Sequence, residues 1–339
     1  MNNYEFKSAE NIDFNKSDIA PYSSFTQSDI FEQWQNHIGY KSKKFVVYKE
    51  NKIVAFFYLY HFPLIFGQEY VYLPYGPVSN DDSDDFLSAI KDFFKKYSRD
   101  NKVAFVRFDF MPIISSQKLN NFFTKTPQYA YHSAHLQPRT EWYLNIQDSE
   151  ENLIANMHKN TRYSIRSAEK RGIEVEIVTE NFRKYFQTFY ELMEITASRN
   201  GFQLHPKKYY EGVFETMEEN KTSHFLSIAR YKDKILAISL IINHEKIANY
   251  VFGCSDNIER NRFPAYLGLW KAILHAKSQG SVYFNFGAIS DENSNAWESL
   301  TRFKKKFGGE EIQHSDFFDL VTNHLFYFLF NLRKKLRNH

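Results

Sequence analysis

Residues 46–57 read VVYKENKIVAFF, and residues 228–239 read IARYKDKILAIS. In both stretches two apolar runs flank a short charged segment, which predicts a β-hairpin. Each hairpin is followed by another predicted strand that ends in a small-residue turn, at 72–77 in the first copy and at 249–255 in the second. Repetition of such a pattern predicts two similar domains in one chain.

The order of the elements within each copy indicates the fold class. The turn is followed by a helical stretch and then by a strand that ends near an acidic or glycine position, at 103–109 and at 282–287. The order hairpin, strand, helix, strand is that of the acetyltransferase-like (GNAT) α/β fold. We therefore expect two tandem GNAT-like domains with a cleft between them. Because this fold hosts many functions, the function has to be argued from the sites.

The composition is that of a globular protein with no strong charge bias. A chain of 339 residues with 43% hydrophobic content is long enough for two packed cores. Its single cysteine, Cys254, cannot form an intramolecular disulfide, which favours a reducing compartment. The formal net charge of +3 excludes a global polycation, so any nucleic-acid site must come from a local cluster of cations.

The two ends of the chain bear on its location. Residues 1–15 are polar and carry no export signal, and no apolar stretch of about 18 residues predicts a spanning helix, so a cytoplasmic protein is expected. Residues 320–336 are amphipathic, and Arg333, Lys334, Lys335 and Arg337 lie at the end. This pattern fits peripheral contact with the inner face of the membrane. It also fits a terminal helix that packs on the first domain, with its cations near the negative end of the helix dipole.

The turns that would bind coenzyme A are unsuited to it. A GNAT enzyme holds the pyrophosphate on consecutive backbone N–H groups of a glycine-rich turn that opens a helix. The corresponding turn at 260–266 has no glycine and includes Pro264, which lacks an N–H group. The turn at 80–85 carries four aspartates, which would repel a phosphate. We expect no cofactor, and no cysteine or histidine pair has the spacing of a metal site.

Five segments stand out in the order in which they occur. They are Tyr72–Val78 (YLPYGPV), Arg107–Asp109 (RFD), Gln137–Arg139 (QPR), Asn156–Val175 (NMHKNTRYSIRSAEKRGIEV), and Phe303-Lys304 with Phe307–Gly309. Together they span nearly the whole chain and resemble the signature of the Fem aminoacyltransferases (FemA, FemB and FemX). The sequence contains no heptad run, so no coiled-coil arm is predicted, and the chain resembles the shorter FemX-like branch.

This resemblance implies both an activity and a domain plan. The activity is transfer of an amino acid from aminoacyl-tRNA to the stem-peptide amine of a peptidoglycan precursor, which forms the interpeptide bridge. The shorter branch uses a soluble UDP-linked muramyl-pentapeptide as this precursor. In the implied plan, residues 1–147 form the first domain together with the C-terminal segment 315–339, and residues 148–314 form the second.

The implied reaction is aminolysis of an activated ester. It needs an unprotonated amine held near the carbonyl carbon, and stabilisation of the oxyanion that forms. By resemblance, Phe303 and Lys304 lie where the acceptor end of the tRNA enters, and Lys304 stabilises the tetrahedral intermediate. The neighbouring Arg302, Lys305 and Lys306 are expected to hold RNA phosphates. Without the resemblance, the same run is typical of an ordinary solvated cation cluster.

Two further residues are substrate-site candidates by resemblance. Asp109 ends a predicted strand beneath the cleft, where its family counterpart contacts the muramyl peptide. Its carboxylate would orient the peptide or accept a proton from the attacking ammonium. The alternative is an aspartate that caps a loop. Tyr209 matches a substrate-binding tyrosine, and core packing is the alternative for this ring.

The chain departs from the family pattern at three positions. His205 stands in place of an arginine that grips the precursor's pyrophosphate, and Gln35 in place of its partner lysine. Phe252 replaces a tyrosine of the acceptor site. Because charge-assisted contacts are the stronger ones, the loss of both cations weakens the case for the nucleotide-linked precursor, and lipid II, a lipid-linked precursor, is the other candidate. The alternative is that Lys43, Lys207 or Lys208 supplies the missing charge.

A basic stripe is predicted on one helix of the second half. The helix is expected from Asp148 to Lys170, with Asp148 and Glu151 as a capping-box-like start. Lys159, Arg162, Arg166 and Lys170 then share one face. This stripe could follow tRNA or belong to the scaffold, and for Arg162 we favour the scaffold.

Two other functions are compatible with the residues. One is an acyl-CoA-dependent GNAT N-acyltransferase acting on a small amine or sugar, which would need coenzyme A to bind despite the two turns. The other is a catalytically inactive protein that binds peptidoglycan or tRNA. Binding of coenzyme A identifies the first alternative, and binding of charged tRNA without turnover identifies the second.

Overall fold

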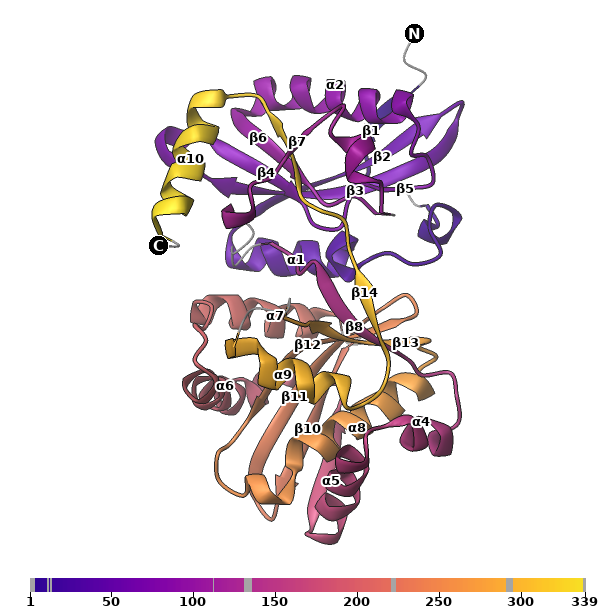
Figure 1. Cartoon of the computed structure of the whole chain (residues 1–339), viewed down its shortest axis with the longest axis vertical. Coiled ribbons are helices and arrows are strands. Elements are labelled where there is room, and N and C mark those ends of the chain that lie inside the picture. Colours follow the sequence, from indigo (N-terminus) through magenta and orange to yellow (C-terminus); the bar gives the residue numbers. More distant parts are fainter. Residues whose placement is uncertain are drawn as a thin grey trace. The chain divides into compact units, whose positions relative to one another are not determined.

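A computed structural model of the chain describes residues 4–10, 12, 14–111, 113–130, 136–220, 224–290 and 295–337. The chain divides into two compact units, Met1–Arg139 with His314–His339, and Thr140–Gln313. Each unit is built on one mixed β-sheet with helices packed against it (Figure 1). The sequence also predicts a polar loop over 290–295, and most of this segment lies outside the described residues.

The sheet of the first unit has the strand order β1-β2-β3-β4-β6-β15-β7, and β5 pairs with β3. Its strands are β1 (Tyr4–Ser8), β2 (Lys41–Lys49), β3 (Lys52–Pro63), β4 (Glu69–Leu73), β5 (Val78–Ser79), β6 (Val103–Phe108), β7 (Thr124–Lys125) and β15 (Phe318–Val321). Its helices are α1 (Asp29–Ile38), α2 (Asp84–Asn101), α3 (Ser116–Leu119) and α10 (His324–Arg337). Phe86, Ile90 and Phe94 recur every four residues on α2, so they share the face that packs into the core.

The sheet of the second unit has the strand order β14-β8-β13-β12-β11-β10-β9. Its strands are β8 (Thr140–Asn145), β9 (Ile173–Val178), β10 (His224–Tyr231), β11 (Lys234–His244), β12 (Ile247–Ser255), β13 (Tyr283–Ala288) and β14 (Glu310–Gln313). Its helices are α4 (Glu150–Asn156), α5 (Lys159–Lys170), α6 (Phe186–Asn200), α7 (Lys207–Glu219), α8 (Pro264–Ser278) and α9 (Asn295–Lys305). Trp270 and Ile273 of α8 are buried in the core of this unit.

The repeat read from the sequence is present in both units. The strands β2 and β3 form an antiparallel hairpin, and so do β10 and β11. Each hairpin has a register shift, between Val47 and Tyr48 in one and between Ala229 and Arg230 in the other, at equivalent positions of the two sequences. The following strands pair in parallel across a helix, β4 with β6 and β12 with β13. The predicted order of elements is therefore confirmed in both units.

Each sheet also contains strands that are not part of the repeated segment. The C-terminal strand β15 lies antiparallel to β6, with Phe318 opposite Phe108. In the second unit, β8 pairs with both β13 and β14. Because β8 belongs to this sheet, the structure divides the chain at 139/140 rather than at the expected 147/148, and at 313/314 rather than at 314/315.

A buried ion pair fastens the C-terminal segment to the first unit. The Arg107 guanidinium donates from Nε and Nη2 to the two carboxylate oxygens of Asp319, at 2.7 and 2.9 Å. The Tyr327 hydroxyl of α10 donates to the same carboxylate at 2.8 Å. Both charged side chains are almost fully buried, so each depends on the other for compensation.

The single helix expected over 148–170 is two helices in the structure. Ser149, not Asp148, caps α4, since its hydroxyl accepts the N–H of Asn152. The backbone of Met157 is extended and separates α4 from α5. Arg162 donates to the carbonyls of Ala155 and Met157 at the end of α4. This contact fits the scaffold role favoured for Arg162.

Candidate functional site

Lys304 is a buried cation near the end of α9. Only 6% of the residue is exposed, and Nζ donates to the Ala288 carbonyl at 2.6 Å. Gly287 lies beside the ammonium group, because a Cβ there would be in van der Waals contact with Nζ at 3.8 Å. Burial lowers the pKa of Lys304 to about 8, although the negative charge of Glu141 acts in the opposite direction. Lysines with such a pKa occur at catalytic sites more often than on solvated surfaces.

A polar network that the sequence analysis missed accompanies this lysine. The amide nitrogen of Asn285 lies 3.1 Å from Glu141 Oε1, 3.1 Å from the Tyr143 hydroxyl and 3.2 Å from Asn249 Oδ1. The Asn285 side-chain oxygen Oδ1 accepts the Gly287 N–H at 2.7 Å. These groups lie on the neighbouring strands β8, β13 and β12. The one available signal was an acidic residue, Glu141, directly before the strand-like residues 142–146, since acidic side chains are uncommon in strands.

Phe303 lies on the same helix and packs into an aromatic group. Its ring lies 5.0 Å from that of Tyr266 and 5.3 Å from that of Phe307, both edge to face. Phe307 is fully buried and is stacked with Tyr266 at 5.9 Å. The side chain of Phe303 is partly exposed, so it both anchors α9 and contributes to the surface beside Lys304.

The three cations next to Lys304 differ in their surroundings. The Arg302 side chain is 66% exposed and lies 3.8 Å from Glu298. Lys305 lies 3.5 Å from Glu311 and 4.9 Å from the ring centre of Trp142. Lys306 is partly exposed, and its backbone carbonyl accepts the His158 N–H at 3.0 Å. Acidic neighbours therefore offset part of the positive charge of this run.

The structure brings His205, Tyr209 and Phe252 together. The rings of His205 and Tyr209 are stacked at 4.1 Å, and Phe252 lies 6.3 Å from Tyr209 and 5.1 Å from Tyr210. Burial lowers the pKa of His205, so this side chain is neutral at pH 7. The nearby Lys207 lies over the rings of Phe186 and Tyr190. The assembly is an aromatic surface, and Lys207 is a cation beside it.

Asp109 and Gln35 belong to the first unit. The Asp109 carboxylate is almost fully buried and accepts from the Tyr72 hydroxyl at 2.8 Å and from the Tyr75 N–H at 2.5 Å. Burial raises its pKa well above the ordinary value despite these donors. Gln35 lies buried on α1, and its amide nitrogen has no hydrogen-bond partner among the described residues. Lys43, an alternative phosphate cation, donates to Asn101 at 3.2 Å.

Groups of the chain itself fill the two turns considered for coenzyme A. At the start of α2, Asp81 accepts the Ser83 N–H at 2.9 Å and binds Lys49 at 2.8 Å. An internal carboxylate thus lies at the helix N-terminus where a phosphate would bind. At the start of α8, Arg262 donates to the Arg171 carbonyl at 3.0 Å, and Pro264 opens the helix.

No metal or thiol chemistry is indicated by the described part of the chain. It contains no group of three or more histidine, cysteine, aspartate or glutamate residues placed to hold a metal ion. Cys254 is buried, and burial raises the pKa of its thiol far above the ordinary value. A protonated buried thiol is a poor nucleophile. No helix among the described residues is long and apolar enough to cross a membrane.

Comparison with solved structures supports the fold. The crystal structure of FemX superposes with a TM-score of 0.78 at 17% identity, over 94% of this chain and 98% of that one. A tandem GNAT protein from the clavulanic acid biosynthesis pathway has a TM-score of 0.56 at 10% identity, with coverage of 94% and 98%. The prediction of two tandem GNAT-like domains is confirmed.

Comparison of sequences supports the resemblance. A segment of 119 residues is 29% identical to the lipid II:glycine glycyltransferase of Staphylococcus aureus, and it spans 34% of this chain and 28% of that relative. The model of the FemAB family matches residues 10–231 and 221–335. Because these two matches cover nearly the whole chain, the predicted resemblance is confirmed, and the chain belongs to the FemAB family.

Proposed function

We propose that this protein transfers an aminoacyl group from aminoacyl-tRNA to the stem-peptide amine of a peptidoglycan precursor. The observation that carries the proposal is Lys304, a cation buried beside Gly287 and oriented by the Ala288 carbonyl. Membership of the FemAB family supports a bridge-forming transferase. The similarity to a lipid II:glycine glycyltransferase supports the same class of acceptor.

The proposed chemistry needs no enzyme nucleophile, metal or cofactor. The acceptor amine attacks the ester carbonyl, a C–N bond forms, and a negative charge develops on the carbonyl oxygen. The Lys304 ammonium stabilises this oxyanion. The C–O bond to the tRNA then breaks, and the 3′-oxygen leaves with a proton. Because its pKa of about 8 is close to neutral pH, Lys304 is suited to supply that proton and to regain one from solvent.

The other candidate residues are assigned around this step. Phe303 lies against the acceptor end of the tRNA, and Arg302, Lys305 and Lys306 bind its phosphates. His205, Tyr209, Phe252, Gln35 and Asp109 contact the precursor. Asp109 orients the peptide or accepts the proton that the attacking amine releases.

The precursor proposed here is lipid-linked. His205 and Gln35 occupy the two positions that hold phosphate-binding cations in the FemX-like branch, and neither carries a charge at pH 7. The aromatic surface around Tyr209 suits the sugar and peptide better than a pyrophosphate. A lipid-linked precursor implies a protein of the cytoplasm that works at the inner face of the membrane, with the C-terminal basic helix in peripheral contact.

The decisive experiment follows a labelled amino acid from charged tRNA onto the precursor. We expect transfer to the lipid-linked muramyl-pentapeptide in preference to the UDP-linked form. Lys304→Met is expected to lose most of this activity, because removal of an oxyanion donor typically costs about 10² to 10³ in kcat. Lys271→Met, which changes a lysine whose side chain is 42% exposed, is the matched control and should stay active.

Three results would reject parts of this scheme. Full activity of Lys304→Met would remove Lys304 from the mechanism. A thermal shift with coenzyme A, together with acylation of a small amine, would identify a GNAT N-acyltransferase instead. Tight binding of charged tRNA with no transfer to any precursor would indicate an inactive binding protein.

A further inference from the structure

The C-terminal helix α10 has an exposed apolar stripe. Leu325, Phe328, Leu332 and Leu336 are 63%, 62%, 41% and 70% exposed. They occur at spacings of three, four and four residues, which places them on one face of the helix. Four large apolar side chains in one line are an exposed patch that calls for an explanation, unlike apolar residues scattered singly over a surface.

This stripe is not what attaches α10 to the protein. The opposite face of the helix makes that attachment, through the Tyr327 hydroxyl on Asp319 and the Phe330 ring, which lies 5.4 Å from Tyr70 and 5.1 Å from Phe105. The helix therefore has a fixed orientation, and its apolar stripe is free to meet another surface.

Cations border the stripe. Arg333 and Lys335 are exposed, and neither takes part in an ion pair among the residues that the structure describes. Lys334 is partly exposed and lies 5.7 Å from the centre of the Phe330 ring. An apolar stripe flanked by basic side chains is typical of a helix that lies in the interface of an anionic membrane.

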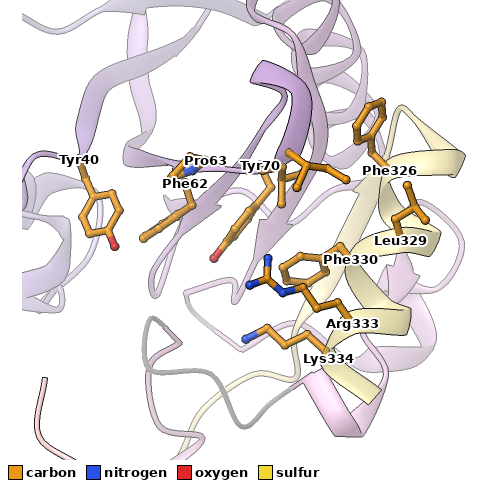
Figure 2. Close-up of a pocket in the computed structure, with 11 residues that line it drawn as sticks. Tyr40, Phe62, Pro63, Tyr70, Phe326, Leu329, Phe330, Arg333 and Lys334 are labelled. Atoms are coloured by element: carbon orange, nitrogen blue, oxygen red, sulfur yellow. The ribbon is translucent and has the colours of Figure 1, made fainter. Parts of the chain in front are cut away.

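Two of these cations, Arg333 and Lys334, also line an aromatic pocket of the first unit. It has a volume of about 470 Å³, and Tyr40, Phe62, Tyr70 and Phe330 are among the residues that line it. The rings of Tyr40 and Phe62 lie 4.7 Å apart and those of Phe62 and Tyr70 5.0 Å apart, so they form a continuous wall. Figure 2 shows the charged ends of Arg333 and Lys334 reaching from α10 toward this wall.

A short segment after β3 extends the same surface. Ile65 lines the pocket and is 46% exposed, and Phe66 beside it is 86% exposed. The Phe66 ring lies 6.5 Å from that of Phe326 on α10. Phe66 is therefore an almost fully exposed aromatic side chain beside α10.

We propose that α10, Ile65 and Phe66 form a docking surface for an anionic lipid bilayer, and that Arg333 and Lys334 hold a lipid phosphate at the mouth of the aromatic pocket. This inference deepens the proposed function. It rests on the proposed function in one respect, namely that the precursor is lipid-linked and the protein therefore works at a membrane. Charge complementarity selects this occupant, because the apolar residues and the cations match the acyl region and the phosphates of such a bilayer.

The same charges argue against a second copy of the chain as occupant. A symmetric dimer uses the same patch on both subunits. Such a dimer through α10 would bring the cations of the two stripes close together, with no acidic residue on the helix to compensate them.

The test is sedimentation of the full-length protein with vesicles of phosphatidylcholine alone or mixed with phosphatidylglycerol. We expect binding to the anionic vesicles, at least about tenfold weaker binding to the neutral ones, and a decrease with salt. Phe328→Ser with Leu332→Ser should weaken binding at least about tenfold. Arg333→Gln with Lys334→Gln should weaken it about 25-fold, since each cation contributes roughly fivefold.

Matched controls change exposed residues elsewhere. Ile258→Ser alters an apolar residue that is 59% exposed, and Lys96→Gln an exposed lysine of α2, and both should bind like the wild type. Equal binding of the wild type to neutral and anionic vesicles, or wild-type binding by both double variants, would overturn the proposal. The proposal would also be overturned if the wild type did not bind vesicles but formed a dimer in lipid-free sedimentation, and if Phe328→Ser with Leu332→Ser dissociated that dimer. The surface would then be assigned to self-association.

The transferase activity is measured separately, on the lipid-linked precursor in detergent and on a soluble acceptor. If the wild type binds anionic vesicles but transfers to neither acceptor, the proposed function fails and the docking surface stands. If the α10 variants transfer normally to the soluble acceptor and the wild type shows no preference for anionic vesicles, the docking surface fails and the proposed function stands.

Discussion

Lys304→Met should remove activity without lowering stability at neutral pH. Burial lowers the pKa of this lysine from 10.5 to about 8. Each pKa unit corresponds to about 1.4 kcal/mol, so holding the charged form inside the folded unit costs about 3 kcal/mol below pH 8. Methionine has a similar length and no charge, so it removes this cost. It also leaves the Ala288 carbonyl without its donor, at about 1 to 3 kcal/mol. The variant should therefore equal the wild type in stability or exceed it by up to about 2 kcal/mol.

The pH dependence of this difference has a defined sign. The pKa of Lys304 is lower in the folded state than in the unfolded state, so the unfolded state binds more protons between about pH 8 and 10.5. The free energy of unfolding of the wild type gains from this lysine as the pH rises through that window. The variant lacks this contribution, while all other groups titrate in both proteins. Its advantage over the wild type should shrink by about 3 kcal/mol between pH 7 and 10.5.

Urea unfolding followed by tryptophan fluorescence measures both quantities at a series of pH values. The control Lys271→Met changes a half-exposed lysine and should show no such dependence on pH. This reasoning would be refuted if the free energy of unfolding of Lys304→Met were more than about 2 kcal/mol below that of the wild type at pH 7. The contacts of the lysine would then stabilise the fold by more than the burial of its charge costs. A stability difference that stays constant from pH 7 to 10.5 would contradict the burial of its charge.

Three further substitutions test other parts of the molecule. Asp109→Asn should reduce transfer at least about tenfold, because an amide cannot accept a proton from the attacking amine. Its free energy of unfolding should change by less than about 1 kcal/mol, since burial already disfavours the charged carboxylate. Normal specific activity of this variant would mean that Asp109 only caps a loop. Asp319→Asn should lower the free energy of unfolding of the first unit by about 3 to 5 kcal/mol in urea, because it leaves Arg107 buried without its counter-charge; an unchanged midpoint would contradict this. Gly309→Ala should cost more than about 2 kcal/mol, because φ is +103° there and the new Cβ would lie 2.2 Å from the Tyr143 carbonyl oxygen; a wild-type melting curve would show that the turn adapts.

The repeated architecture could be predicted from the sequence because its signals are local. Alternating apolar residues and charged turns define the two hairpins, and even the register shifts fall at equivalent positions of the repeat. The extra strands are different. The pairing of β15 with β6 joins residues about two hundred positions apart, and no local pattern encodes such a partner. The resemblance to a family and the amphipathic pattern of residues 320–336 suggested that the C-terminal segment returns to the first domain, but neither identified the strand with which β15 pairs.

The candidate site shows the same division. Lys304 was identified by resemblance, whereas a run of cations would by itself be taken as solvated. Its burial follows from helical spacing, since Thr301 and Lys304 lie three positions apart on α9 and both are buried. The contact of Asn285 with Glu141 spans 144 positions, so it appears only once the sheet is assembled. Burial and long-range contacts, which decide the pKa of the lysine, are properties of the folded unit.

Under the proposed function, the uncharged side chains of His205 and Gln35 and the basic apolar helix α10 have one physical explanation. A soluble nucleotide-linked acceptor must be captured by contacts in the site, and charge-assisted bonds to its pyrophosphate are the strongest ones available. An acceptor confined to a membrane meets a docked enzyme at a high effective concentration, so the site needs less affinity of its own. Variants of α10 should then raise KM for the lipid-linked acceptor and leave KM for a soluble acceptor unchanged. An equal rise for both would mean that α10 supports the site through the fold and not through the membrane.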